Sequence, residues 1–141
     1  HLESEPINAM RVTLEEGLAQ ADCVMVSVAL NQDTRKMISG PQFDLLKPNA
    51  VLVNVSRGPV IDESAMVDAL ERGQLFGVGL DVYEEEPTIH PGLLKHPRAF
   101  IMPHLGSATI EDRTELTELA VENVLAVLKG SKPPYQIQIP R

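Results

Sequence analysis

Cysteine is nearly absent from the sequence, and tryptophan is absent altogether. The one cysteine, Cys23, lies in the apolar run CVMVSVAL, where we expect a small core residue. It has no partner in the chain for an internal disulfide, which predicts a reducing, cytoplasmic environment. No apolar stretch approaches the roughly 20 residues of a membrane span, and the first residues, HLESEPINAM, do not resemble a signal peptide. We therefore expect no membrane partner.

Basic residues are scarce: 12 Lys and Arg stand against 20 Asp and Glu, for a formal charge of −8. Nucleic acids and anionic membranes bind through many Lys and Arg side chains, so neither is expected as a partner. An anionic small substrate would instead need one local positive group. The length of 141 residues is that of a single globular domain with its own hydrophobic core.

Several catalytic motifs are also missing. The four histidines and the cysteine show no metal-ligand spacing such as CxxC or HExxH, so no metal site is expected. The sequence contains no GxSxG motif of serine hydrolases and no GxxxxGK[ST] phosphate loop. The sequence therefore indicates neither hydrolysis by an activated serine nor the binding of a nucleoside triphosphate.

Apolar runs of strand length alternate with helical patterns along the chain. We expect buried strands at 23–30 and 50–56, and further strands at 75–82 and 100–102. Helices are expected at 13–20, with Thr13 and Glu16 as a capping box, at 41–46, at 62–73, capped by Asp62 or Ser64, and at 109–130. The segment 83–97 reads as a loop with one helical turn near 91–94, and the tail as extended. This alternation predicts an α/β fold: a doubly wound parallel sheet covered on both faces.

Three ionisable residues follow three of the expected strands. Arg57 comes directly after VLVNVS, Glu86 lies four residues beyond LFGVGLDV, and His104 comes just after AFIMP. Parallel strands bring their carboxyl ends to one edge of the sheet, where ligands bind. We therefore expect a cation, a carboxylate and an imidazole to meet in one crevice.

Such a trio suits a substrate that carries both a carbonyl and a carboxylate. Arg57 can hold a carboxylate or polarise a carbonyl, and His104 can donate or accept a proton near neutral pH. A neighbouring Glu86 would favour the imidazolium form and orient the ring. A hydride would have to come from a cofactor. Each residue also has an ordinary structural interpretation: a loop ion pair for Arg57, a solvated charge run for Glu86 and a satisfied loop histidine for His104.

Two long segments resemble a known family. VNVSRGPVIDESAMVDALERGQLFGVGLDVYEEEP and MPHLGSAT are similar to the NAD(P)-binding domain of D-isomer-specific 2-hydroxyacid dehydrogenases, most of all to glyoxylate and hydroxypyruvate reductases. The resemblance covers about 13–130. It implies a partial Rossmann-type domain without its Gly-rich loop at 1–108, followed by a C-terminal helix and tail at 109–141.

The resemblance also implies roles for individual residues. Arg57 would bind the 2-oxoacid, His104 would be the general acid and base, and Glu86 would pair with that histidine. The other implied residues are those that line the cofactor or the substrate: Ala29, Val55, Asp81 and Gly106 for the cofactor, and Ser107, with Arg57 and His104, for the substrate.

The family's GxGxxG pyrophosphate loop does not occur in the sequence. The residues that select between the two dinucleotides are missing with it, so the implied cofactor is NAD or NADP. We expect the chain to be a carboxyl-terminal fragment that is inactive by itself, its full-length parent being a homodimer that acts on a small 2-oxoacid or 2-hydroxyacid.

Two other functions stay open. Some members of the family are NAD(H)-sensing corepressors that act by binding partners and keep the same three residues. The LGSAT that follows His104 favours the enzyme, because the corepressor branch typically has an aromatic residue shortly after the histidine. The chain could also be a structural remnant without activity.

Overall fold

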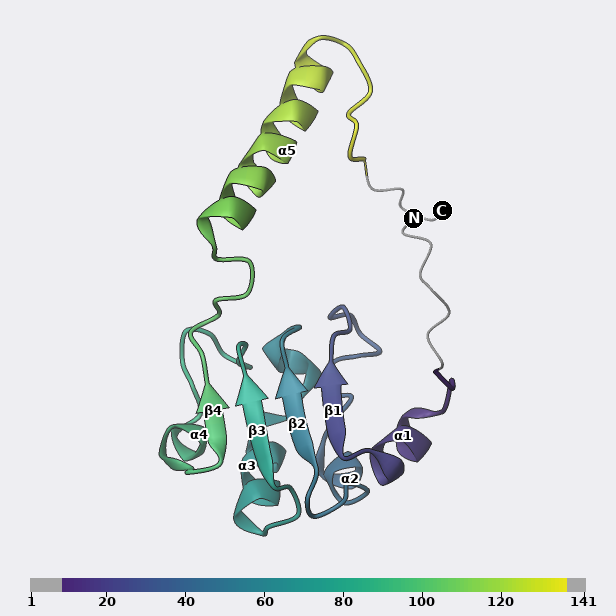
Figure 1. Ribbon diagram of the computed structural model, residues 1–141, viewed down its shortest axis with the longest axis vertical. Coiled ribbons are helices and arrows are strands. Elements are labelled where there is room, and N and C mark those ends of the chain that lie inside the picture. The colour runs from purple at the N-terminus through teal and green to yellow at the C-terminus, as the bar shows by residue number, and fades with distance from the viewer. Residues whose placement is uncertain (1–8, 137–141) are drawn as a thin grey trace. The chain divides into compact units, whose positions relative to one another are not determined.

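The computed structural model describes residues 9–136 (Figure 1). Predictions for residues 1–8 and 137–141, including the end of the tail, lie outside the described residues. The chain divides into two compact units, His1–His104 and Leu105–Arg141. The first unit holds a parallel sheet with its helices, and the second holds one long helix.

The sheet has four strands in the order in which they occur along the chain: β1 (Cys23–Val26), β2 (Val51–Asn54), β3 (Gly77–Leu80) and β4 (Ala99–Ile101). Every neighbouring pair is parallel. The predicted α/β class with a parallel sheet is therefore confirmed.

The helices of the first unit are α1 (Leu14–Gln20), α2 (Gly40–Phe43), α3 (Glu63–Glu71), α4 (Pro91–Lys95) and a 3₁₀ turn, η1 (Gly58–Val60). Two predicted caps are confirmed. Thr13 and Glu16 form the capping box of α1, and the Asp62 side chain accepts a hydrogen bond from the Ala65 N–H, at 3.1 Å, to begin α3. Gly73, with φ +71°, lies just beyond the end of α3, as expected for a left-handed C-terminal residue.

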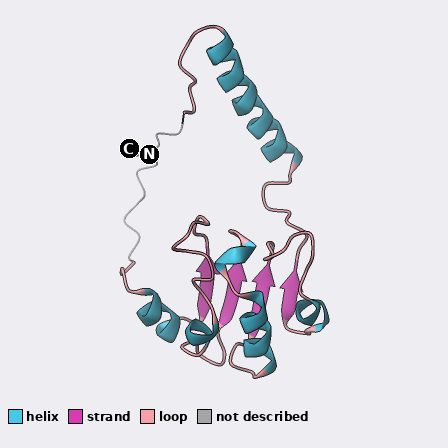
Figure 2. Ribbon diagram, turned by 180° about the vertical axis from the view of Figure 1, so that it is seen from behind, coloured by secondary structure: helices cyan, strands magenta, loops and turns pink. Residues whose placement is uncertain are grey.

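The hydrophobic core lies on one face of the sheet. Right-handed crossovers between strands that follow in chain order place all the connecting helices on the same side, and α2 and α3 lie in front of the strands in Figure 2. Leu52 and Leu70 are fully buried between these layers, whereas Met25 and Phe100 on the opposite face are 61% and 69% exposed. Within the described residues, the expected cover on both faces is therefore not found.

The prediction for the first strand is wrong in its length and in its burial. β1 ends at Val26 rather than Leu30, and it is an edge strand that pairs only with β2. Cys23 is exposed and is not a core residue. It points to the uncovered face, whereas Val26 points to the helices and is buried.

The second strand stops two residues before the predicted end, at Asn54. The buried Asn54 side chain accepts hydrogen bonds from the backbone N–H and the hydroxyl of Ser56, at 3.0 and 2.9 Å. These local bonds compete with the strand ladder and turn the chain. The predicted ranges differ at other elements as well: α2 ends at Phe43 rather than 46, β3 is shorter than 75–82, and β4 begins one residue early.

The second unit is built around α5 (Ile110–Leu128). Thr109 caps it, as predicted, by accepting a hydrogen bond from the Asp112 N–H at 3.1 Å, and Gly130 follows its end with φ +73°. None of the residues of α5 is buried. In the part of the chain that the structure describes, no helix is both long enough and apolar enough to cross a membrane.

The backbone of Gly58 lies against the backbone of Tyr83, in the loop after β3. A Cβ at this position would lie 1.8 Å from the carbonyl oxygen of Tyr83, which no rotamer can relieve. We expect Gly58→Ala to lower the free energy of unfolding by about 2 kcal/mol or more in urea titrations.

Gly40→Ala is the matched control, because a Cβ there meets nothing within 4 Å. Its unfolding free energy is expected to stay within about 0.5 kcal/mol of the original chain. Equal stability of the two variants would contradict the close approach at Gly58.

Candidate active site

The turn after β2 presents Arg57. Asn54, only 1% exposed, donates a hydrogen bond from its side-chain amide to the carbonyl oxygen of Arg57 at 3.1 Å. The Arg57 backbone is extended, and its guanidinium donates to the Ser56 carbonyl oxygen at 2.6 Å. A buried amide therefore fixes the backbone that carries an exposed cation, so that the guanidinium lies at the carboxyl edge of the sheet.

Arg57 borders a hollow of about 660 Å³ at this edge. Ala29 lines the same hollow, and its carbonyl oxygen accepts a hydrogen bond from the Thr34 hydroxyl at 2.7 Å. Two residues to which the sequence assigned a ligand role thus share one concave surface. The remaining lining residues are the neighbours of these two: Ser27, Val28, Leu30 and Ser56.

The other predicted cofactor residues of the first unit lie at the same edge. Val55 follows β2 and is 54% exposed. Asp81 follows β3 and is buried, and its backbone N–H donates to the carbonyl oxygen of Asn54 at 3.1 Å. These positions place an apolar side chain and a carboxylate next to the turn that carries Arg57.

Glu86 and His104 form a hydrogen-bonded pair. The Oε2 atom of Glu86 lies 2.8 Å from Nδ1 of His104, and its Oε1 atom accepts the backbone N–H of Tyr83 at 3.0 Å. His104 lies three residues beyond the end of β4 and has φ +53°, a conformation uncommon outside glycine. Because Nδ1 faces the carboxylate, Nε2 is the ring nitrogen available to a substrate.

Opposing effects determine the ionisation of Glu86. Partial burial acts to raise its pKa, but the hydrogen bonds with His104 and with the Tyr83 N–H, together with the positive charges of His104 and Arg57, outweigh burial and lower the pKa below its ordinary value. Arg57 is therefore close enough for its charge to lower the pKa of Glu86. The carboxylate is ionised at neutral pH, as a partner for an imidazolium must be.

Gly106 and Ser107 belong to the second unit. Ser107 has φ +61°, and the Ala108 N–H donates to the Leu105 carbonyl oxygen at 3.0 Å, which closes a turn there. The predicted roles of Gly106 and Ser107 at the cofactor and the substrate stay predictions. Across residues 9–136, no group of three or more His, Cys, Asp or Glu side chains could hold a metal ion.

Residues that support the site were missed by the sequence analysis. Asn54 was detectable in principle, because it is the one polar residue within the apolar run AVLVNV. Tyr83 gave no such signal, yet its buried hydroxyl donates to the carbonyl oxygen of Met102, two residues before His104. Its backbone N–H donates to Glu86, so Tyr83 contacts the segments of both members of the pair.

The sheet is parallel, and Arg57 and the hydrogen-bonded Glu86–His104 pair lie at its carboxyl edge, where open α/β folds bind their ligands. Residues 2–106 match the family model described as D-isomer specific 2-hydroxyacid dehydrogenase, NAD binding domain. The match covers well over half of the chain, and the chain belongs to this family.

Similar proteins support the assignment to this family. Glyoxylate reductase of Thermococcus litoralis is 42% identical over 130 residues, which are 92% of this chain and 39% of that protein. The crystal structure of the TT0316 protein of Thermus thermophilus superimposes with a TM-score of 0.89 at 40% identity, over 96% of this chain and 43% of that one.

A third similar structure is that of an NADPH-dependent glyoxylate/hydroxypyruvate reductase of Sinorhizobium meliloti in complex with citrate. Its TM-score is 0.86 at 32% identity, over 95% of this chain and 42% of that one. The chain thus spans about two fifths of the length of the proteins it matches.

The contact with His104 should control the pKa of Glu86. His104→Gln removes a hydrogen bond and a positive charge from Glu86, so the pKa of Glu86 should rise towards its ordinary value of 4.5. Carboxyl ¹³C NMR titration of Glu86 measures this change. His96→Gln is the control. The His96 ring accepts a hydrogen bond from the Arg98 N–H, and it takes no part in the contact between Glu86 and His104.

Stability should follow the same linkage. A carboxylate whose pKa is lowered by folding contributes stability above its unfolded pKa, and this contribution disappears as the pH falls through the folded pKa. The difference in unfolding free energy between the original chain and His104→Gln should therefore shrink on acidification. A difference that grows towards low pH would contradict the pairing.

Proposed function

We propose that this chain supplies the substrate-binding and proton-transfer part of an NAD(P)-dependent reductase of small 2-oxoacids. The observation that carries the proposal is the 2.8 Å contact between Glu86 and His104, with Arg57 close enough to lower the pKa of the same carboxylate. A histidine paired with a carboxylate beside a cation is suited, in its protonated form, to act as the general acid that protonates the carbonyl oxygen of an anionic substrate.

In the proposed reaction, the Arg57 guanidinium binds the substrate carboxylate and polarises the adjacent carbonyl. His104, protonated and oriented through Nδ1 by Glu86, donates the Nε2 proton to the carbonyl oxygen as hydride arrives at the carbonyl carbon. Negative charge on that oxygen is thereby neutralised, and the product is a 2-hydroxyacid. In the reverse direction His104 accepts the hydroxyl proton.

The nicotinamide cofactor supplies the hydride when bound. The hollow that Arg57 and Ala29 line at the carboxyl edge fits such a group, because its Val28, Ala29 and Leu30 offer apolar surface beside the cation. Val55, Asp81 and Gly106 are the further residues proposed to contact it. The relative from Sinorhizobium meliloti is NADPH-dependent, and the proposed cofactor of this chain is NAD or NADP.

The relatives favour this activity over the corepressor alternative and the structural remnant. Two of them are a glyoxylate reductase and a glyoxylate/hydroxypyruvate reductase. Glyoxylate and hydroxypyruvate are accordingly the proposed substrates. We also propose that the full-length parent is a cytoplasmic homodimer.

Two substitutions in a full-length dehydrogenase that carries this segment should impair different kinetic constants. His104→Gln removes the proton donor and should lower kcat by about 100-fold or more. Arg57→Lys keeps the charge but loses the two-pronged geometry, so it should mainly raise the KM for glyoxylate. Steady-state kinetics separate the two effects. Unchanged turnover by His104→Gln would refute the proton-transfer assignment.

The 141-residue chain alone should be inactive. Its sequence has no GxGxxG loop, whose backbone N–H groups and helix N-terminus bind the pyrophosphate in Rossmann domains. Tight dinucleotide binding is therefore not expected, and purified chain should not oxidise NADH or NADPH in the presence of glyoxylate. Any rate above a matched His104→Gln preparation of the same chain would overturn this expectation.

A further inference from the structure

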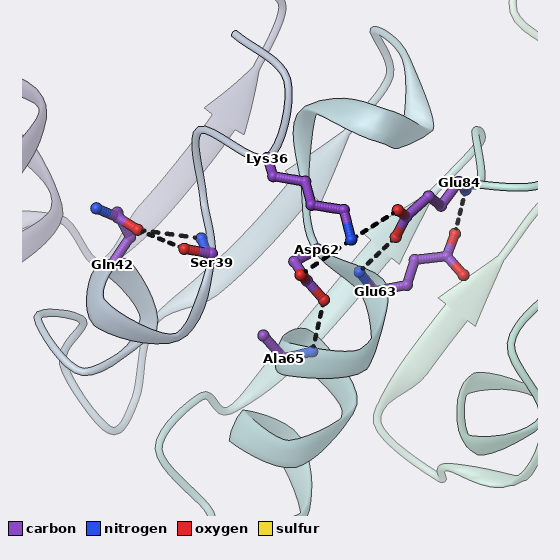
Figure 3. A network of polar contacts seen from close by, with 7 residues as sticks. All are labelled: Lys36, Ser39, Gln42, Asp62, Glu63, Ala65 and Glu84. Carbon is purple, nitrogen blue, oxygen red and sulfur yellow. Dashed lines mark hydrogen bonds and ion pairs between the residues drawn. The ribbon is translucent and has the colours of Figure 1, made fainter.

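A second network of charged residues lies outside the site, and the proposed reaction uses none of it (Figure 3). Glu63 is the first residue of α3 and is only 6% exposed. Its backbone N–H donates to Oε2 of Glu84 at 3.2 Å, and its own carboxylate accepts the backbone N–H of Glu84. The two glutamates therefore bind each other's backbone reciprocally and connect α3 to the loop that follows β3.

Burial raises the pKa of Glu63, and the backbone of His90, at the far end of the loop 84–90, acts in the opposite direction. The buried Glu63 side chain anchors the start of this loop through the Glu84 N–H. Inside that loop, the Thr88 N–H donates to the Glu85 carbonyl oxygen at 2.8 Å and closes a tight turn. Glu86, the partner of His104, lies within this turn. Its backbone position is therefore set by a closed turn that begins next to Glu84, the residue that Glu63 anchors.

The concentration of negative charge is balanced by Lys36. Its ammonium lies 2.9 Å from Oε1 of Glu84 and 3.1 Å from Oδ2 of Asp62. Figure 3 shows the lysine reaching both acids from one side while Glu63 meets Glu84 from the other. Lys36 binds Glu84, and the carboxylate of Glu63 accepts the backbone N–H of Glu84.

We propose that Glu63 is a positioning residue for the Glu86–His104 pair, because its buried carboxylate fixes the start of the loop that carries Glu86. The inference rests on the proposed function for the catalytic meaning of the pair. A carboxylate suits this task because its negative charge strengthens the hydrogen bond from a backbone N–H, whereas the side-chain oxygen of a glutamine is neutral.

The test is Glu63→Gln in the 141-residue chain, observed by NMR. The Glu84 amide then loses its charged acceptor, and its hydrogen exchange should accelerate about tenfold. If the loop positions Glu86, its carboxylate should also lose part of its contact with His104. The carboxyl ¹³C titration of Glu86 should then move to higher pH, while the other groups that lower its pKa, the Tyr83 N–H and Arg57, stay in the chain.

Glu71→Gln is the matched control, because Glu71 is exposed at the other end of α3. Neither the exchange rates nor the Glu86 titration should change in it. If Glu63→Gln does not fold, Glu63→Asp keeps the charge but withdraws it by one methylene, and the same two shifts are expected.

An unchanged Glu86 titration in a variant whose Glu84 amide exchanges faster would overturn the proposal, since Glu63 would then be structural only. Unchanged exchange would overturn it as well. Neither measurement depends on turnover. A negative result therefore leaves the reductase proposal standing, and an inactive parent enzyme would not alter the NMR result.

Discussion

The packing of Gly58 against the carbonyl group of Tyr83 is the constraint on which the site depends. A Cβ at Gly58 would lie 1.8 Å from that oxygen, so the two backbones can meet only where a residue has no side chain. Gly58 follows Arg57, and Tyr83 donates its N–H to the Glu86 carboxylate. The same contact therefore brings the turn with the substrate-binding cation against the loop with the paired acid.

Two glutamates of this region show how similar surroundings produce opposite ionisation behaviour. Burial opposes the charged form of both Glu63 and Glu86, and both accept backbone N–H groups. Glu86 also has the imidazole of His104 and the charge of Arg57, so its pKa is lowered. Glu63 is more deeply buried and lies next to the negative Glu84, so its pKa is raised. A cationic neighbour thus distinguishes the acid proposed for the chemistry from the acid proposed to hold the loop.

The features that could be predicted from the sequence are those encoded locally. The capping box at Thr13 depends on two residues three positions apart, and the strand positions follow from apolar runs, so both were predictable. The meeting of Glu86 and His104 followed from a topological rule about parallel strands. The exposure of Cys23 could not be predicted in this way, because an apolar run does not reveal that its strand lies at an edge. The contacts of Gly58 and Glu63 join residues more than 20 positions apart, and no local pattern encodes them.

The arrangement of the site follows from the sheet rather than from long side chains. Neighbouring strands lie about 4.8 Å apart, so turns that leave β2, β3 and β4 at one edge begin within about 10 Å of one another. Arg57 follows β2, the loop with Glu86 follows β3, and His104 follows β4. Glu86 spans the last gap with a short side chain whose second oxygen is occupied by its own loop. Its reach is therefore limited by the backbone, and residues that hold that backbone control the pair without contacting it.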